Sequence, residues 1–374
     1  MLLVVMLVGM VAALFVFGIV DTTAIELRRN QDTAVALAQA KEALIGRAVA
    51  DDTRPGSLPC PDTDDDGVAE IFAGVDCPSY IGRLPWKTLG LPDPRDSAGE
   101  RLWYALAPVF RDNASVGLLD TDTKGSLTVY QDSMATTITS EAVAVIFAPG
   151  PAVAGQIRDP ASANNAANYL ETTGGVNNAI AAGPFISAQT SSLFNDRLLA
   201  ITTAELMPLV EMRVAREMLA LLSAYRVNSA CACYPWAAND FDDDSVTGRR
   251  RGGVPMEDAL PEAWGSGTIP SVPSWIAGAS PNNKWGGLFY YAVAPGVVET
   301  PTAGALTVDG ASKDVVLITT GPAGASRPSS NLGDYLEDLE NRNNDDIFCR
   351  PGASAMAPCT PTAAYARDRL YTLP

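Results

Sequence analysis

Residues 1–20 read MLLVVMLVGMVAALFVFGIV, twenty consecutive positions without a charged side chain. Each helical residue adds about 1.5 Å, so a helix of this length spans the roughly 30 Å hydrocarbon core of a bilayer. The stretch therefore predicts a transmembrane helix. No Lys or Arg precedes it and no clean small-residue cleavage site follows it, which argues against an ordinary secretory signal peptide. A plain N-terminal anchor or an imperfect signal peptide is the alternative.

The helical pattern continues past the apolar run. Between Asp21 and Gly46 the chain contains no Gly or Pro, and apolar residues recur near helical spacing. We therefore expect one helix over residues 1–50, apolar in its first half and amphipathic in its second. Pro55 and Gly56 oppose its continuation, so the segment 51–56 should end it.

Short motifs that follow this helix occur twice, in the same order, which predicts an internal repeat. The matching motifs are DSAGERLWYALAP (96–108) with NKWGGLFYYAVAP (283–295), GSLTV (125–129) with GALTV (304–308), Tyr169-Leu170-Glu171 with Tyr335-Leu336-Glu337, Asn177-Asn178 with Asn343-Asn344, and Asp196-Arg197-Leu198 with Asp368-Arg369-Leu370. We expect a first unit at 34–202 and a second at 205–374.

Each unit predicts a leading helix, an irregular loop and several β-strands, which makes the fold class α+β. Residues 206–225 form the expected helix of the second unit. Apolar and β-branched residues bounded by Gly, Pro or Asp favour strands elsewhere. The expected strands contain WYALA (103–107), SLTVY (126–130), AVAVIFA (142–148) and RLLAIT (197–202), then YYAVA (290–294), ALTV (305–308), DVVLITT (314–320) and RLYTL (369–373). Each unit is thus expected to hold a loop-rich antiparallel β-sheet led by a helix.

Three motifs of the first unit resemble blocks found in prepilin-like proteins of proteobacteria: LPCPDTDDDG (58–67), GRLPWKTLGLP (82–92) and DSAGERLWYALAPVF (96–110). A long helix followed by a loop-rich sheet also resembles type IV pilins and type II secretion pseudopilins. The resemblance implies a non-enzymatic structural subunit of a filament. Its helix would be held in the bacterial inner membrane and then pack against other pilin or pseudopilin subunits. The globular units would lie in the periplasm or on the filament.

The chain departs from the common pilin pattern at its N-terminus. Val5 stands where most pilins carry Glu, which is similar to the minor pseudopilins at filament tips. Arg28 and Arg29 follow the apolar run, which by charge bias alone favours the opposite orientation. A basic leader removed before Met1 would resolve this conflict, so we expect Met1 to be the processed and methylated N-terminus. The alternative function is a membrane-anchored, calcium-dependent adhesion or binding protein that does not polymerise.

Composition excludes several kinds of function. The chain has 26 basic and 43 acidic residues and a formal net charge of −17, which opposes binding to nucleic acid. It contains no histidine, so a Ser-His-Asp triad, a Cys-His pair and a histidine-ligated metal are all excluded. Glycoside hydrolysis by paired carboxylates has no supporting pattern. We expect no catalytic residues.

An even number of cysteines in an export-like chain indicates disulfides formed in an oxidising compartment. The six are Cys60, Cys77, Cys231, Cys233, Cys349 and Cys359. The first two flank an acidic loop and are expected to pair, as are the last two, which bracket a Pro/Gly/Ala loop. The middle two bridge to each other across one residue, or pair with the last two. Zinc is disfavoured because no C-x-x-C pair is present.

The acidic loop 62–70 reads DTDDDGVAE. Asp at positions 1, 3 and 5 with Gly at 6 is the front half of a calcium loop, although Ala73 stands where an EF-hand has its bidentate Glu. We therefore expect a looser calcium site, and the alternative is a solvated acidic turn. The candidate ligands are Asp62, Asp64, Asp66, the carbonyl of Val68 and Glu70, with a repeat at Asp240, Asp242 and Asp244 in the second unit.

Overall fold

The computed structural model describes the backbone of residues 2–23, and backbone and side chains of residues 24–113, 117–237, 249–254, 285–298, 306–319, 336, 341, 345–350 and 369–374. The chain divides into two compact units. Unit 1 comprises residues 1–47, 58–112 and 124–203, and unit 2 comprises residues 48–57, 113–123 and 204–374. The α+β class predicted from the sequence is confirmed: each unit combines one long helix with antiparallel-rich β-sheet.

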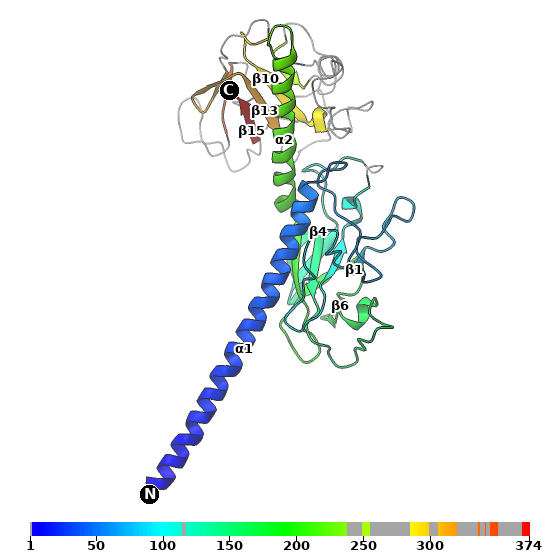
Figure 1. Cartoon of the computed structure of the whole chain (residues 1–374), viewed down its shortest axis with the longest axis vertical. Helices are drawn as coiled ribbons and strands as arrows, with labels where there is room; N and C mark the ends of the chain where they lie inside the picture. The colour runs from blue at the N-terminus through cyan, green and yellow to red at the C-terminus, as the bar shows by residue number, and fades with distance from the viewer. Residues whose placement is uncertain are drawn as a thin grey trace. The chain divides into compact units, whose positions relative to one another are not determined.

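Helix α1 (Leu2–Val49) is one continuous helix, as expected from the absence of Gly and Pro between Asp21 and Gly46 (Figure 1). It ends just before Asp51, whose Oδ1 accepts hydrogen bonds from the backbone N–H groups of Thr53 and Arg54. Among the residues with described side chains, no helix is long and apolar enough to cross a membrane. The predicted transmembrane stretch 1–20 lies outside that set.

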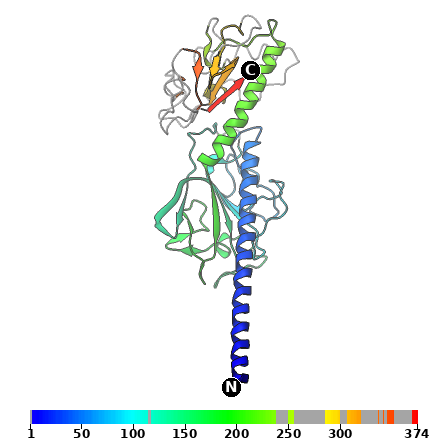
Figure 2. The ribbon, with the colours of Figure 1, turned by 90° about the vertical axis from the view of Figure 1, so that its left-hand side faces the viewer.

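The second half of α1 packs on the sheet of unit 1 (Figure 1, Figure 2). Ala36, Leu37, Ala40 and Leu44 are each at most 6% exposed, and their three- and four-residue spacing places them on one helix face. Residues 24–32 are all exposed. Among its residues with described side chains, the helix is therefore amphipathic where it meets its own sheet.

The sheet of unit 1 has the order β1-β2-β4-β3-β7, with β8 paired to β4. Its strands are β1 (Ile81–Arg83), β2 (Trp103–Leu106), β3 (Leu127–Gln131), β4 (Ser133–Ala148), β7 (Phe185–Ser187) and β8 (Arg197–Thr202). All pairs are antiparallel except β3 with β7. A separate hairpin joins β5 (Thr172–Thr173) and β6 (Val176–Asn177). Short 3₁₀ turns lie at η1 (Pro108–Phe110) and η2 (Ala166–Asn168).

Unit 2 is led by α2 (Thr203–Asn228), which begins at Thr203 and therefore contains Pro208 inside the helix, where proline removes one backbone hydrogen bond. Its sheets have the orders β15-β13-β10-β9 and β12-β11-β14. The elements are β9 (Arg251–Gly253), η4 (Trp285–Leu288), β10 (Phe289–Val293), β11 (Leu306–Val308), β12 (Ala311–Lys313), β13 (Val315–Thr319), β14 (Ile347–Phe348) and β15 (Arg369–Leu373).

Buried tyrosines on β2 and β10 make the same contacts in the two units. Tyr104 lies opposite Gly82 on β1, and Tyr291 lies opposite Gly252 on β9. The Tyr104 hydroxyl donates to the carbonyl of Pro59 at 3.3 Å, and the Tyr291 hydroxyl donates to that of Pro235 at 2.9 Å. The two copies of the aligned motif at 96–108 and 283–295 therefore occupy equivalent strands in the same register.

One motif match from the sequence needs correction. Asn178 donates to the carbonyl of Ile186 at 3.0 Å and accepts from its N–H at 2.8 Å. Asn341 makes the same pair of bonds with Cys349, at 3.3 and 2.9 Å. Asn341, rather than a residue of the pair 343–344, is thus the counterpart of Asn178. The loop ahead of it is shorter in unit 2, which shifted the match.

Candidate functional site

The acidic loop 62–70 begins at the edge of the unit 1 sheet. Asp62 exchanges backbone hydrogen bonds with Arg83 of β1, at 3.0 and 2.6 Å. The expected disulfide between Cys60 and Cys77 is present, with 5.5 Å between the Cα atoms. The loop is therefore anchored both to a strand and by a covalent bond.

The Asp62 carboxylate organises the loop from inside. The residue is 1% exposed, and its Oδ1 accepts from the N–H groups of Asp64 at 3.1 Å and Asp65 at 2.7 Å. Its Oδ2 accepts from the N–H of Gly67 at 2.7 Å. Burial raises the pKa of Asp62, and these backbone N–H donors act in the opposite direction. The first predicted ligand is thus also the structural centre of the turn.

Gly67, the glycine at position 6 of the calcium-loop pattern, is required by the local backbone. Its φ of +86° lies in the left-handed region, where a residue with a Cβ is strained. A Cβ placed there would lie 2.5 Å from Nε1 of Trp86. Both the backbone conformation and the close approach of the indole therefore select glycine.

Three of the predicted ligands come together. One carboxylate oxygen each from Asp62, Asp64 and Glu70 lies within 4.8 Å of the others. Calcium binds oxygen at roughly 2.3–2.6 Å, so ligands on opposite sides of the ion are about 5 Å apart. The Glu70 Oε1 is held by the N–H of Thr63 at 2.9 Å and its hydroxyl at 2.6 Å. The triad has the size and oxygen chemistry of a calcium site, and exposed acidic groups of this kind also occur without an ion.

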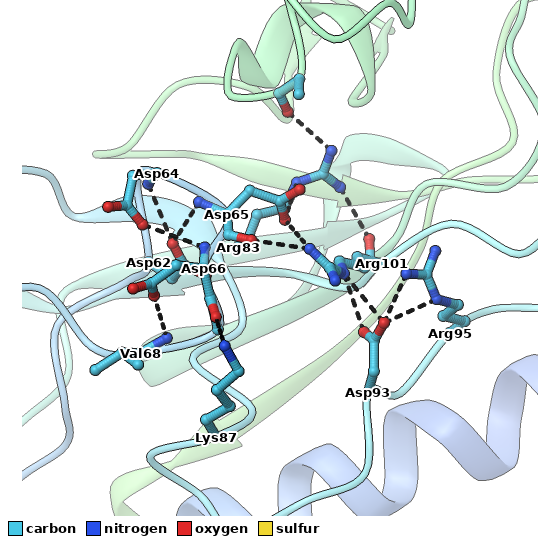
Figure 3. Close-up of polar contacts among 12 residues, drawn as sticks. Asp62, Asp64, Asp65, Asp66, Val68, Arg83, Lys87, Asp93, Arg95 and Arg101 are labelled. Atoms are coloured by element: carbon cyan, nitrogen blue, oxygen red, sulfur yellow. Dashed lines mark hydrogen bonds and ion pairs between the residues drawn. The ribbon is translucent and has the colours of Figure 1, made fainter.

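Asp66 lies outside this triad. Its carboxylate accepts from the N–H of Val68 at 2.6 Å, a contact visible in Figure 3. Its carbonyl accepts from the Lys87 ammonium group. The Asp66 side chain therefore caps the turn rather than converging with Asp62, Asp64 and Glu70.

Asp65, which was not among the predicted ligands, faces a group of arginines on the other side of the loop (Figure 3). Arg101 donates to the Asp65 carbonyl at 2.9 Å, and its guanidinium lies 2.8 Å from the Asp65 carboxylate. Arg101 also bonds Asp93 at 3.1 Å, and Asp93 bonds Arg95 at 2.6 Å. Partial burial acts to lower the pKa of Arg101, but Asp65 and Asp93 raise it overall. These arginines offset part of the charge of the acidic loop.

A second pair of carboxyl groups lies in the core of unit 1. Asp196 is 2% exposed and its Oδ2 accepts from the N–H of Glu171 at 2.8 Å and from Asn178 Nδ2 at 2.9 Å. Glu171 Oε2 accepts from the N–H groups of Asn195 at 2.8 Å and Asp196 at 3.0 Å. Burial and the charge of Glu171 raise the pKa of Asp196 well above its usual range. Asp196 therefore resists ionisation more than an exposed aspartate does.

The sequence offered one signal for this second pair. Glu171, Asn178 and Asp196 each belong to a motif that occurs in both halves of the chain. The repeat indicated that each of these residues has a counterpart in the second half of the chain, but it did not show that the three contact one another. Their contacts span 18 to 25 residues, so spacing along the chain does not reveal them.

The remaining predicted sites are only partly described. Cys231 and Cys233 are bonded to each other, which is one of the two arrangements expected from the sequence. Cys349 is also disulfide-bonded, and its expected partner Cys359 lies outside the described residues. The proposed second calcium loop, with Asp240, Asp242 and Asp244, lies outside them too. Met1, the expected methylation site, also lies outside the described residues.

Comparison of the chain with known protein families, with curated proteins and with solved structures gives no match.

Proposed function

We propose that this chain is a structural subunit, of the minor or tip kind, of a type IV pilus or a type II secretion pseudopilus-like filament. Its N-terminal helix holds it in the bacterial inner membrane before assembly and packs against other subunits afterwards. The observation that carries the proposal is helix α1, which continues well beyond the sheet that covers its second half.

The projecting part of α1 lacks cover from its own chain over the residues with described side chains. Residues 24–32 are exposed, and Thr33 is the first buried position. Ile25 is 52% exposed and Leu27 is 64% exposed. Helices in proteins are stabilised mainly by packing rather than by intrinsic propensity, so a long projecting helix favours an external partner. Lipid and the helices of neighbouring subunits supply such partners.

The two globular units support a specialised place in the filament. A helix that packs on an antiparallel-rich sheet is the pilin-like arrangement, and α2 with its sheets repeats it with matching strand register. We interpret the chain as a pilin-like head that has been doubled. A doubled head is bulky, so crowding would limit dense packing along a filament and favour a minor or tip position.

Loop stabilisation fits the same role. A filament outside the cytoplasm is exposed to mechanical and proteolytic stress, and disulfides and calcium both restrict loop opening. The Cys60–Cys77 bond closes the segment that also carries the Asp62, Asp64 and Glu70 triad. In this proposal, calcium has a structural rather than a catalytic role.

The proposal is tested by intact-mass and N-terminal peptide analysis of the native protein from sheared-filament and membrane fractions. We expect an N-methylated Met1 as the first residue in the filament fraction. A longer, unmethylated N-terminus found only in membranes would overturn the proposal.

A matched pair of variants tests the role of the projecting helix. Leu27→Asp places a charge on α1, and Ile180→Asp places one on a loop of unit 1, where the side chain is 51% exposed. We expect Leu27→Asp to reduce incorporation into filaments at least about tenfold, because a buried unpaired charge is costly between packed helices. Ile180→Asp should leave incorporation within about twofold. Equal incorporation of the two variants would contradict the helix-packing role.

The acidic triad favours one alternative, a membrane-anchored, calcium-dependent adhesion or binding protein that never polymerises. The two functions differ in one measurable property. The alternative predicts that the protein stays in the membrane fraction after shearing, with calcium-dependent binding to a surface.

A further inference from the structure

An exposed apolar side chain is held at the surface of the segment that the Cys60–Cys77 disulfide closes. Ile71 is 87% exposed, and the same segment carries Val75 at 54% and Val68 at 45%. Single exposed apolar residues are common, but three within eight positions of one constrained segment are not explained by folding. We call Val68, Ile71 and Val75 the apolar tip.

The backbone that carries the apolar tip is fixed by several contacts. Ala69 N–H donates to the Thr88 hydroxyl at 2.8 Å, and Ala73 N–H donates to the Asp76 carbonyl at 2.8 Å. Arg111 Nε donates to the Val75 carbonyl at 2.7 Å. A partner that binds this segment therefore has little conformational entropy to remove from it, which favours recognition.

The segment around the apolar tip carries a surplus of negative charge, although the Lys87 ammonium group donates to the Asp66 carbonyl. Six acidic residues and no basic residue lie between Cys60 and Cys77: Asp62, Asp64, Asp65, Asp66, Glu70 and Asp76. Two of these carboxylates are paired with arginines. The Arg101 guanidinium lies 2.8 Å from the Asp65 carboxylate, and the Arg111 guanidinium lies 3.3 Å from the Asp76 carboxylate. Asp64 and Asp66 are exposed, so a net negative rim is left beside the apolar side chains. In Figure 3 the Val68 side chain points away from the arginines.

We propose that the apolar tip is a docking site for another protein, which receives Ile71 in an apolar pocket edged by Lys or Arg side chains. Charge complementarity selects this occupant. A second copy of the chain would bring two negative rims together within a protein of net charge −17. A bilayer containing anionic lipid would meet the same repulsion. Ile71 supplies the anchor, and the carboxylates steer the approach of the partner.

This docking site lies on the head of unit 1 and uses no part of helix α1. It therefore goes beyond the proposed filament function, and either can fail without the other. A chain that has lost docking should therefore still enter filaments. Incorporation is measured by the same assay as for the Leu27→Asp variant.

The test uses the full-length chain in cells that produce it, with a photo-crosslinking amino acid in place of Ile71. The matched control carries the same amino acid in place of Ile180, which is 51% exposed and lies in a different loop. We expect irradiation to give a discrete adduct with a second protein at position 71 and at least about tenfold less of it at position 180. The crosslinked peptide of the partner should contain Lys or Arg beside apolar residues.

The other occupants give distinct results, and each overturns the proposal. Adducts with lipid indicate a membrane contact, and adducts with the chain itself indicate self-association. A yield at position 71 no higher than at position 180 shows that the segment has no partner. Crosslinking to a partner surface without basic residues contradicts the charge argument.

Affinity supplies a second measurement once the crosslinked protein has been purified. Ile71→Ser should weaken binding about 10- to 30-fold, as for a central apolar anchor, whereas Ile180→Ser should change it less than about twofold. Ile71 is largely exposed, so the melting temperature of the variant should equal that of the unchanged chain. Binding that does not weaken as salt is raised from about 0.05 to 0.5 M would contradict steering by the acidic rim.

Discussion

Unit 1 contains two groups of acidic side chains that balance their charge in opposite ways. The loop 62–70 faces solvent, and there backbone N–H donors and Arg101 compensate the carboxylates. The pair Glu171 and Asp196 is buried, with exposures of 5% and 2%, and burial together with the charge of Glu171 raises the pKa of Asp196. The difference lies in the neighbouring charges: Asp65 of the loop has an arginine partner, whereas Asp196 faces the second carboxyl group of Glu171.

The largest expected effect is at the buried pair. Glu171→Ala removes the acceptor of the N–H groups of Asn195, which is partly buried, and Asp196, which is buried. We expect a loss of about 3 kcal/mol in the free energy of opening of unit 1. This free energy is measured by hydrogen exchange of the Ile186 amide, which donates to the Asn178 side chain.

The matched control for Glu171→Ala is Glu141→Ala. Glu141 is an exposed acid with an ion pair to Lys124, so its removal should cost less than about 0.5 kcal/mol. Equal costs at Glu171 and Glu141 would show that the buried pair contributes no special stability.

The buried pair should also make unit 1 less stable as pH rises. Asp196 has a raised pKa in the folded chain, so the folded state binds more protons than the unfolded state above pH about 4. Its stabilisation is complete below that pH and is lost as pH rises through the raised pKa. Asp196→Asn has no proton to lose and should flatten the profile. The measurement is the exchange free energy of the Ile186 amide between pH 4 and 8, corrected for intrinsic exchange.

The informative quantity is the difference between the pH profiles of the unchanged chain and of the Asp196→Asn variant. Arg158, Glu100 and Gln156 also face Glu171 and Asp196 from neighbouring segments, and they are present in both. A difference curve that is flat, or that rises with pH, would contradict a raised pKa of Asp196.

Gly67→Ala tests the solvent-facing loop. The substitution combines a strained φ with a contact to the Trp86 indole, and we expect a loss of about 2 kcal/mol in local stability. Gly74→Ala is the control, because Gly74 also has a positive φ of +74° but has nothing within 4 Å of the added Cβ. That change should cost about 1 kcal/mol. Both losses of stability are measured by hydrogen exchange of the amide at position 67, which donates to the Asp62 carboxylate.

Calcium provides the smallest expected effect and separates the two acidic groups directly. At ten times its dissociation constant, calcium should stabilise the loop 62–70 by about 1.4 kcal/mol, measured by exchange of the Asp64 to Val68 amides. Asp64→Asn should abolish the effect, whereas Glu141→Gln should preserve it. Amides near Glu171 and Asp196 should not respond. Identical protection in calcium and in a chelator would identify the loop as a solvated acidic turn.

Much of the fold follows from local sequence. β2 and β10 were predictable because every residue of both is apolar and buried. The first half of β4 was not, because Ser133 to Ser140 is largely exposed and has no alternation of buried and exposed positions. The sequence predicted a strand only from residue 142 onward. Hydrogen bonds to β3, rather than a buried face, extend β4 back to Ser133.

The candidate site was predictable where the chemistry is local. Asp62, Asp64 and Glu70 lie within nine residues, so their spacing carried the prediction. Arg101 contacts Asp65 across 36 positions, and no short pattern shows that contact. Asn341 was missed for a related reason, because a difference in loop length moved it out of the aligned motif.

The clamp made by Asn178 and Asn341 has a practical consequence. Each closes a loop of the same size onto β7 or β14, while the stretch ahead of it differs: Leu170 precedes Asn178 by eight positions, and Leu336 precedes Asn341 by five. The stretch between this leucine and this asparagine therefore has two different lengths in the two units of the chain. The turn Gly174-Gly175 between β5 and β6 lies in the longer of the two stretches, so we expect it to accept an inserted epitope or fluorophore tag while Asn178 keeps its bonds to Ile186.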